Sequence, residues 1–274
     1  MPSNAPIGVF DSGLGGLSVL QAVRALLPHE SLLYVADSRF APYGERPDAF
    51  IALRSLAIGR WLRERGAKAF VVACNTATAH GVAALRADAD WPVVGVEPGI
   101  KPAAAASRSG VIGVLATAAT LRSARFADLL ARHTAQGQRF LCQPGHGLVE
   151  CIEAGDVDSP EVAALIERYV APMVAQGADT LVLGCTHYPF LIPAIQRRFG
   201  PALTLVDTGA AIARQLQRRL EAADLCAARV PGVTGTVELF TTANAQALQT
   251  MADRLLTDAP AVQMVEIGSV DVAA

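Results

Sequence analysis

Short apolar runs alternate with amphipathic segments along the whole chain, and this alternation most constrains its fold. IGVF (7–10), SLLYVAD (31–37) and LVLG (181–184) are examples, and helical segments separate most of these runs. The runs are continuously apolar, which is typical of strands buried on both faces. Strands that alternate with helices in this way predict parallel sheets covered by helices. The sequence therefore predicts an α/β, doubly wound architecture.

Individual elements can be placed from local signals. Pro28 ends a helix that begins near Leu17, and Pro47 and Asp48 open a long helix that Gly66 closes. Ser159 and Pro160 are expected as the N-cap and first residue of another helix. The expected strands are IGVF, SLLYVAD, AFVVACN, PVVGVEPG, GVIGVLAT, RFLC, DTLVLGCT, LTLVDTG, TVELFTT and VQMVEIG.

Three strand–loop units recur at nearly one spacing. IGVF (7–10) returns as IGVL (112–115), an offset of 105, and FVVACNTAT (70–78) returns as LVLGCTHYP (181–189), an offset of 111. Glu97 in VGVEPG falls on Asp207 in LVDTG, an offset of 110. Any one match could be chance, but three in the same order indicate a duplication. We therefore expect two similar domains related by a pseudo-two-fold axis.

Composition and charge exclude several classes of protein. The 274 residues are 52% apolar and 18% charged, with a net charge of −2 and no basic run, which argues against disorder and nucleic-acid binding. No apolar run approaches the roughly 18–20 residues of a membrane span, and MPSNAP does not resemble a signal peptide. Five widely spaced cysteines without a CxxC pair do not form a disulfide or zinc-finger framework. The sequence predicts a soluble, cytoplasmic chain.

Two of the cysteines, Cys74 and Cys185, occupy equivalent positions in the repeat, each just after an apolar strand. Ligands of open α/β sheets bind beyond the carboxyl ends of the strands. If the two halves enclose one cleft, these thiols lie on opposite walls of it. The active site is therefore expected in the cleft between the domains.

This pair is compatible with four kinds of chemistry. Cys185 and His187 could begin a zinc site, although Cys-x-His is a weak signal. The two thiols could form a redox couple, but they lack the short spacing that tunes a dithiol. Cys185 alone could be a nucleophile beside His187, which would leave Cys74 idle. As an acid and a base on opposite faces of one carbon, both have a role, and the centre inverts.

The last alternative needs thiols that ionise easily. A free thiol has a pKa of about 8.5, and a helix start directly after each cysteine would favour its anion. Asn75 and Thr76 follow one thiol, and Thr186 and His187 follow the other, as hydrogen-bond donors. His187 is the candidate proton partner of Cys185, and Asp11 is the candidate on the Cys74 side.

Two other features of the sequence bear on cofactor chemistry. DSGLGGLS (11–18) is not a dinucleotide fingerprint, because Ser18 replaces the last glycine, and it lacks the P-loop lysine. The loop could be structural or could bind a small anion. Lys68 and Lys101 are the only lysines available for a pyridoxal Schiff base, and neither has a suitable context. No cofactor and no metal are therefore expected.

The motifs together resemble those of the glutamate racemases, within the aspartate/glutamate racemase superfamily. The resemblance covers nearly the whole chain and is marked by IGVFDSGLGGLSVL (7–20), YVADSRFAPYGERP (34–47), VVACNTATA (71–79), GVEPGIKPA (95–103), LATAAT (115–120) and LGCTHYPFL (183–191). It implies a cofactor-independent isomerase that supplies D-glutamate for peptidoglycan synthesis, and commonly a homodimer. It also implies a first domain of residues 1–97 plus 207–274 and a second of residues 98–206.

The resemblance also implies roles for individual residues. Cys74 and Cys185 would be the two acid/base groups, and Glu150 the acidic residue that assists one thiol, with Glu153 as an alternative. The substrate would be bound by Asp11, Ser12, Tyr43, Gly44, Asn75, Thr76, Thr117, Thr120, Thr186 and His187.

Other functions stay open at the level of sequence. A racemase or decarboxylase of the same superfamily could act on another substrate, although decarboxylase relatives tend to lack one cysteine. A protein that closes on an amino acid without chemistry would not need paired thiols.

Overall fold

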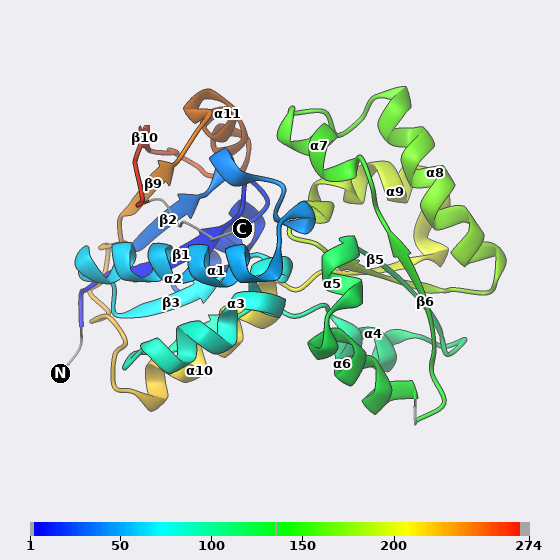
Figure 1. The fold of residues 1–274 in the computed structure, drawn as a ribbon, viewed down its shortest axis with the longest axis horizontal. Helices are drawn as coiled ribbons and strands as arrows, with labels where there is room; N and C mark the ends of the chain where they lie inside the picture. The colour runs from blue at the N-terminus through cyan, green and yellow to red at the C-terminus, as the bar shows by residue number, and fades with distance from the viewer. Residues whose placement is uncertain (1–2, 135, 269–274) are drawn as a thin grey trace. The chain divides into compact units, whose positions relative to one another are not determined.

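The computed structural model describes residues 3–134 and 136–268 (Figure 1). As far as they are described, these residues form two compact units. Unit 1 contains the residues up to Val96 and those from Gly209 onward, and unit 2 is Glu97–Thr208. Each unit is built around its own parallel sheet, so the predicted α/β class is confirmed.

The sheet of unit 1 has the strand order β10-β9-β2-β1-β3-β4, and every neighbouring pair is parallel. Its strands are β1 (Ile7–Asp11), β2 (Leu32–Ala36), β3 (Ala69–Val72), β4 (Val93–Gly95), β9 (Val237–Thr241) and β10 (Val262–Met264). Its helices are α1 (Leu17–Leu26), α2 (Asp48–Glu64), α3 (Asn75–Asp88), α10 (Gly209–Ala222) and α11 (Ala245–Leu255), with the 3₁₀ turns η1 (Ser38–Phe40) and η2 (Tyr43–Glu45).

Helices cover both faces of this sheet. Phe10 and Phe70 point to one face, where they form a buried cluster with Ile51 and Leu62 of α2 and Leu85 of α3. Helix α1 packs against α10 and α11 instead. Side chains alternate between the faces of a strand, so strands covered on both sides must be apolar at every position. This explains the continuous apolar runs of the sequence.

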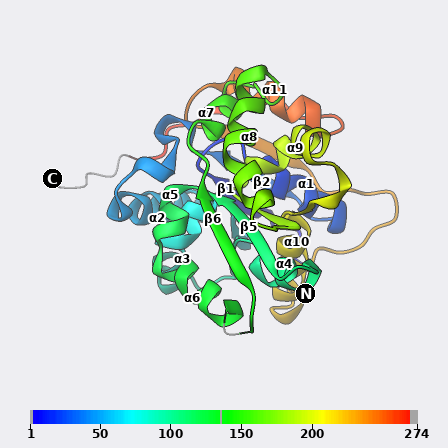
Figure 2. The same ribbon diagram turned by 90° about the vertical axis from the view of Figure 1, so that its right-hand side faces the viewer.

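Unit 2 has a smaller parallel sheet in the order β6-β5-β7-β8. Helices α8 and α9 lie on one side of it, and α4, α5 and α6 lie on the other (Figures 1 and 2). The strands are β5 (Val111–Ala116), β6 (Arg139–Pro144), β7 (Thr180–Gly184) and β8 (Thr204–Val206). The helices are α4 (Ile100–Ala106), α5 (Ala118–Arg122), α6 (Ala124–Thr134), α7 (Leu148–Glu153), α8 (Pro160–Ala175) and α9 (Ile192–Phe199), with the 3₁₀ turns η3 (Tyr188–Leu191) and η4 (Gly200–Ala202).

The two sheets share a strand order. β2-β1-β3-β4 in unit 1 corresponds to β6-β5-β7-β8 in unit 2. The repeated motifs of the sequence fall on matching strands, with IGVF and IGVL on β1 and β5, and the two cysteine motifs following β3 and β7. The internal topology of each unit therefore supports the duplication.

Local signals placed some helix ends well and others poorly. Ser159 caps α8 as predicted, because its Oγ accepts the N–H of Val162 at 3.2 Å. The expectation that a helix starts directly after each cysteine holds only for Cys74, the N-cap of α3. After Cys185 the chain makes a turn and then η3, and α9 begins only at Ile192. The backbone that follows the two thiols therefore has a different conformation in each unit.

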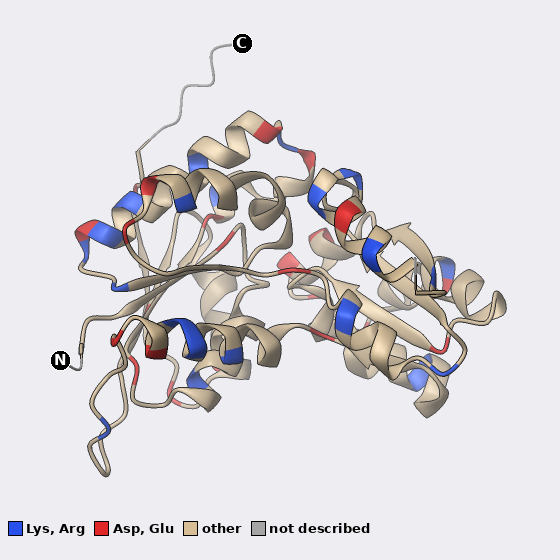
Figure 3. Cartoon of the chain, turned by 90° about the horizontal axis from the view of Figure 1, so that it is seen from below, with Lys and Arg blue, Asp and Glu red and all other residues tan. Residues whose placement is uncertain are grey.

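Acidic and basic residues are interspersed along the visible ribbon, without a long stretch of one sign (Figure 3). In the part of the chain that the structure describes, no helix is both long enough and apolar enough to span a membrane.

Candidate functional site

Cys74 lies at the carboxyl edge of the unit 1 sheet and caps the next helix. Its Sγ accepts the backbone N–H of Ala77 at 3.4 Å and lies 3.4 Å from the Ser12 hydroxyl, which follows β1. The N-terminal end of a helix carries a partial positive charge, so this position stabilises a negative charge on sulfur. The side chain is buried, with 5% of its residue surface exposed. The helix N-terminus and the Ser12 hydroxyl therefore suit Cys74 to exist as a buried thiolate with a fixed position.

Asp11 is the last residue of β1 and organises the loop that follows it. Its Oδ1 accepts the N–H of Gly13 at 2.7 Å and the hydroxyl of Ser12 at 3.5 Å. The Tyr34 hydroxyl donates to the carbonyl of Gly13 at 2.8 Å. The DSGLGGLS loop thus makes structural contacts that fix Asp11 and Ser12 beside Cys74.

Gly16 in this loop leaves the space that Asp11 occupies. A Cβ at position 16 would lie 2.6 Å from the Cβ of Asp11 and 3.0 Å from the Tyr34 hydroxyl. Gly16→Ala is expected to displace Asp11, to reduce kcat/KM by about tenfold and to destabilise the fold by about 1–3 kcal/mol. Steady-state kinetics and urea unfolding measure both effects.

Gly59→Ala serves as the control for crowding alone. Its Cβ would lie 2.8 Å from Cδ2 of Leu85, between α2 and α3. It should leave kcat/KM within about twofold of the wild-type value. Equal losses of activity in both variants would show that Gly16 has no special relation to Asp11.

The first turn of α3 carries buried polar side chains directly after the thiol. Asn75 and Thr76 are 4% and 2% exposed. Oδ1 of Asn75 has no hydrogen-bond donor among the described residues. A buried polar atom is costly without a partner, so this amide oxygen is suited to accept a donor from a ligand.

The side chain of Tyr43 is buried and hydrogen-bonded to Asp37. Its hydroxyl donates to Oδ2 of Asp37 at 2.6 Å, and the ring is 1% exposed. Burial raises the pKa of Tyr43 well above its usual value of 10, and the Asp37 carboxylate raises it further. The phenol is therefore neutral and committed to Asp37. The backbone of Tyr43 and partly buried Gly44 is what this turn can offer a ligand.

The matching edge of unit 2 carries Cys185, which follows β7. Ala116 of β5 pairs with Gly184, so Thr117 lies at the same edge as this thiol. Thr117 caps α5 by accepting the N–H of Thr120 at 3.2 Å, and it donates to the Thr120 hydroxyl at 2.9 Å. Thr186 is 4% exposed. Hydroxyl groups therefore gather beside the second thiol as they do beside the first.

A carboxylate–imidazole–thiol chain distinguishes unit 2. Nδ1 of His187 lies 3.6 Å from Sγ of Cys185, and Nε2 lies 2.5 Å from Oε1 of Glu153. The two partners contact opposite nitrogens of one ring, so the three groups form a line and not a cage. Among residues 3–134 and 136–268, no three or more His, Cys, Asp or Glu residues form a group that could hold a metal ion.

The imidazole of His187 is held in its charged form. Burial lowers its pKa, but the hydrogen bonds and negative charges of Cys185 and Glu153 outweigh burial and raise the pKa well above 6.5. The raised pKa favours the imidazolium form of His187, with Glu153 on one side and the sulfur on the other.

This pairing predicts how stability depends on pH. A pKa that is higher in the folded than in the unfolded state stabilises the fold fully below the unfolded value near 6.5. That contribution is lost as the pH rises through the folded value. An NMR titration of the His187 ring nitrogens should give a pKa above 6.5, and Glu153→Gln should lower it. A His187 pKa at or below 6.5 would contradict the ion pair.

Glu150 and its alternative Glu153 lie at different positions relative to His187. Glu150 is exposed, and the acidic residue in contact with His187 is Glu153, the alternative. Leu148, Val149 and Ile152 form the buried stripe of α7. At 100° per residue, Glu150 points nearly opposite this stripe, whereas Glu153 lies at its edge. The spacing of the apolar residues in LVECIE therefore indicates that Glu153 lies nearer the buried face of α7 than Glu150 does.

Lys68, one of the two lysines considered for a Schiff base, lies away from the cysteine-bearing edge of the unit 1 sheet. Lys68 precedes β3, at the amino edge of the sheet. Its Nζ is 2.6 Å from Oε2 of Glu30 and donates to the carbonyl of Ser3 at 2.5 Å. Both side chains of this ion pair are about 5% exposed or less. Lys68 therefore has a structural role.

The structure gathers the predicted residues into two sets. Asp11, Ser12, Cys74, Asn75 and Thr76 share the carboxyl edge of the unit 1 sheet. Thr117, Thr120, Cys185, Thr186 and His187 share that of unit 2, together with Glu153. Direct contact of Ser12 with Cys74 was not predicted, because the two lie 62 residues apart.

Known proteins share both the sequence and the fold of this chain. Residues 17–216 match the Asp/Glu/Hydantoin racemase family. The glutamate racemase of Cupriavidus pinatubonensis is 58% identical over 252 residues, 92% of each chain. That of Ralstonia nicotianae is 56% identical over 97% of this chain and 95% of its own.

Solved structures give the same result. The glutamate racemase isoform RacE1 of Bacillus anthracis superposes with a TM-score of 0.87 at 30% identity, covering 97% of this chain and 98% of its own. Escherichia coli glutamate racemase, solved with L-glutamate and the activator UDP-MurNAc-Ala, gives a TM-score of 0.80 at 36% identity over 92% and 95%.

Proposed function

The chain belongs to the Asp/Glu/Hydantoin racemase family, and from this premise we propose that it interconverts L- and D-glutamate without a cofactor. The observation that carries the proposal is the pair of buried thiols after β3 and β7, at equivalent positions of two sheets with one strand order. An inversion needs one proton removed and one delivered on opposite faces of the α-carbon. Two equivalent acid/base groups meet that need.

The reaction would proceed with one thiol on each side of the α-carbon. The thiolate of one cysteine removes the α-proton and becomes a thiol. The thiol of the other delivers its proton to the opposite face and becomes a thiolate. The substrate is inverted, and the two cysteines have exchanged protonation states. A cycle in the same direction then needs one proton returned to the second sulfur and one lost from the first.

His187 and Glu153 are suited to the proton balance at Cys185. The imidazolium stabilises a thiolate at 3.6 Å and can donate a proton to it, while Glu153 holds the ring in its charged form and fixed orientation. On the other side, Ser12 and the N-terminus of α3 stabilise the Cys74 thiolate by hydrogen bonding without a cation. Each thiol is thus supported by different means.

The neighbouring polar groups suit a substrate with two carboxylates and an ammonium group. The unpartnered Oδ1 of Asn75 is an acceptor for the ammonium. Hydroxyl and backbone N–H donors at Ser12, Thr76, Thr117, Thr120 and Thr186, and at the Tyr43–Gly44 turn, are donors for carboxylates. Neutral donors bind these anions without adding a further cation beside either thiolate.

Deuterium exchange tests the function directly. The protein is incubated with L- or D-glutamate in deuterated water without pyridoxal phosphate, and α-deuterium and optical rotation are followed. Both enantiomers should exchange and converge on the racemate. Absence of exchange with either enantiomer would refute the proposal, and exchange with aspartate alone would assign another substrate of the same family.

We further propose that the protein works in the cytoplasm as a homodimer and supplies D-glutamate for peptidoglycan. The two proposed acid/base thiols must stay reduced, which suits a reducing compartment. Light scattering at micromolar concentration would test the dimer, since a monomer mass would exclude it. Growth that depends on added D-glutamate after loss of the gene would test the cellular role.

A further inference from the structure

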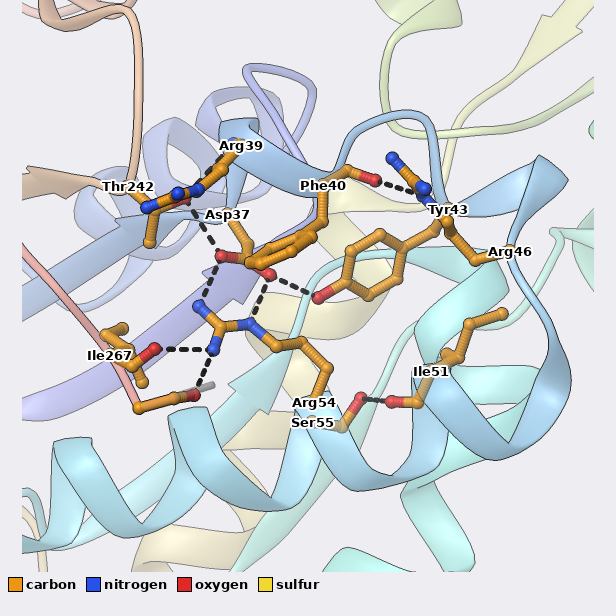
Figure 4. Close-up of polar contacts among 11 residues, drawn as sticks. Asp37, Arg39, Phe40, Tyr43, Arg46, Ile51, Arg54, Ser55, Thr242 and Ile267 are labelled. Carbon is orange, nitrogen blue, oxygen red and sulfur yellow. Dashed lines mark hydrogen bonds and ion pairs between the residues drawn. The ribbon is translucent and has the colours of Figure 1, made fainter. Parts of the chain in front are cut away.

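A buried ion pair of unit 1 lies outside the residues assigned so far. Asp37 follows β2, and Arg54 projects from α2; their side chains are 0% and 1% exposed (Figure 4). Nε and Nη2 of Arg54 donate to Oδ2 and Oδ1 of Asp37 at 2.7 and 2.8 Å. This bidentate geometry fixes the guanidinium in one plane.

Each partner of the pair also binds the backbone or side chain of a distant segment. The Asp37 carboxylate accepts the Tyr43 hydroxyl at 2.6 Å and the Thr242 hydroxyl at 2.9 Å. Nη1 of Arg54 donates to the carbonyls of Ile267 and Gly268 at 2.6 and 2.7 Å. The pair therefore joins the turn containing Tyr43, the end of β9 and the chain beyond β10 (Figure 4).

A buried ion pair is weak evidence for stability, because apolar residues of similar volume often stabilise a fold as well or better. Its distinctive property is directional. Hydrogen bonds in several fixed directions hold three segments at one position, which an apolar cluster would not do as sharply. The role of the pair is therefore to be sought in the segments that it holds.

One of these segments touches the predicted site. The Tyr43 ring is 1% exposed and belongs to the same buried cluster as Cys74, together with Phe10 and Ala77. The turn η2 packs against α3, which Cys74 caps. The side chain of Tyr43 is thus held between Asp37 and the core, which fixes the backbone of Tyr43 and Gly44. We call the hydrogen bonds that link Arg54, Asp37 and Tyr43 the clamp.

We propose that Asp37 and Arg54 are positioning residues of the racemase, which hold the Tyr43–Gly44 turn in place for glutamate through the Tyr43 hydroxyl. The carbonyls of Ile267 and Gly268 orient Arg54 from its other edge, so the end of the described chain is coupled to the substrate turn. This inference rests on the proposed function, because it assigns the turn to the binding of glutamate.

Two substitutions test the clamp at different points. Tyr43→Phe removes only the hydroxyl that reaches Asp37. Arg54→Lys keeps the charge but loses the planar fork, so it cannot bind Asp37 twice and both carbonyls. The clamp predicts that KM for glutamate rises about fivefold in Tyr43→Phe and about tenfold in Arg54→Lys, with kcat within about threefold, because the acid/base groups are intact.

Ser55→Ala is the matched control. Ser55 follows Arg54 on α2, is fully buried, and donates within the helix to the carbonyl of Ile51 at 2.7 Å. This variant loses a buried hydrogen bond without touching the clamp, so its KM should stay at the wild-type value. Unchanged KM values in Tyr43→Phe and Arg54→Lys, with lowered melting temperatures, would reduce the pair to a structural role and overturn the inference.

Amide hydrogen exchange separates this inference from the proposed function. In Arg54→Lys, residues 38–47 and 262–268 should both exchange faster, whereas in Ser55→Ala neither segment should change. An inactive wild-type protein would refute the function while leaving this coupling measurable. Faster exchange in only one of the two segments would show that Arg54 does not couple them. If Arg54→Lys does not fold, Tyr43→Phe still decides the effect on KM.

Discussion

Serine in place of Cys74 or Cys185 is expected to lower the rate of glutamate racemisation by about 10³-fold or more. A serine hydroxyl is a far weaker acid than a thiol, so it neither forms the base nor delivers the proton at neutral pH. Both sulfur atoms lie in buried, structured positions that a serine fits, so the fold should be retained. Circular dichroism at 220 nm verifies the fold, and polarimetry measures racemisation in both directions.

The two variants should also differ from each other. The remaining thiolate has access to one face of the α-carbon only, so any residual α-deuterium exchange should be confined to one enantiomer, and to the opposite one in the other variant. Cys142→Ser is the control, because Cys142 is an exposed thiol on β6. Full activity in either Cys74→Ser or Cys185→Ser would exclude the two-base mechanism.

Glu153→Gln is expected to lower kcat by about 10²-fold. The amide keeps the size of the side chain but removes one of the charges that raise the pKa of His187, so the ring loses its proton at lower pH than in the wild type. A neutral ring stabilises the Cys185 thiolate less and has no spare proton to return. The limb of the pH–rate profile along which activity falls as His187 loses its proton should therefore shift to lower pH.

Glu150→Gln provides a control within the same helix. Glu150 is exposed and lies three residues earlier, so it makes the same chemical change without touching His187. Its kcat should stay within about twofold of the wild-type value. A large loss in Glu150→Gln together with normal activity in Glu153→Gln would reverse the assignment and return it to the residue expected from sequence.

The fold could be predicted well from sequence because each strand carries its own signal. All ten apolar runs form strands, and the continuity of runs such as IGVF reflects burial on both faces of a sheet. Caps such as Ser159 are equally local. The helix expected directly after Cys185 was wrong, because an apolar strand followed by polar residues and proline does not distinguish an α-helix from the turn and 3₁₀ segment found there.

The site was less predictable because its contacts span long separations. The cysteines and the polar residues after them were visible as motifs, but the bond from Arg54 to the carbonyl of Ile267 joins residues 213 apart. No local pattern marks such a pair. The direction of the Tyr43 hydroxyl was hidden for the same reason, since its partner Asp37 is one of many acidic residues in the sequence.

The shared strand order of the two sheets has a consequence for the energetics of the reaction. The thiols after β3 and β7 occupy matching positions but have unlike neighbours, a hydroxyl at Cys74 and an imidazole with a carboxylate at Cys185. L- and D-glutamate are mirror images with an equilibrium constant of unity, so the Haldane relation requires the same kcat/KM in both directions. Any kinetic difference between the two enantiomers can therefore appear only as kcat and KM that are raised or lowered together for one of them. The unlike neighbours can thus set a different KM for each enantiomer, while the ratio of the two kcat/KM values stays at unity.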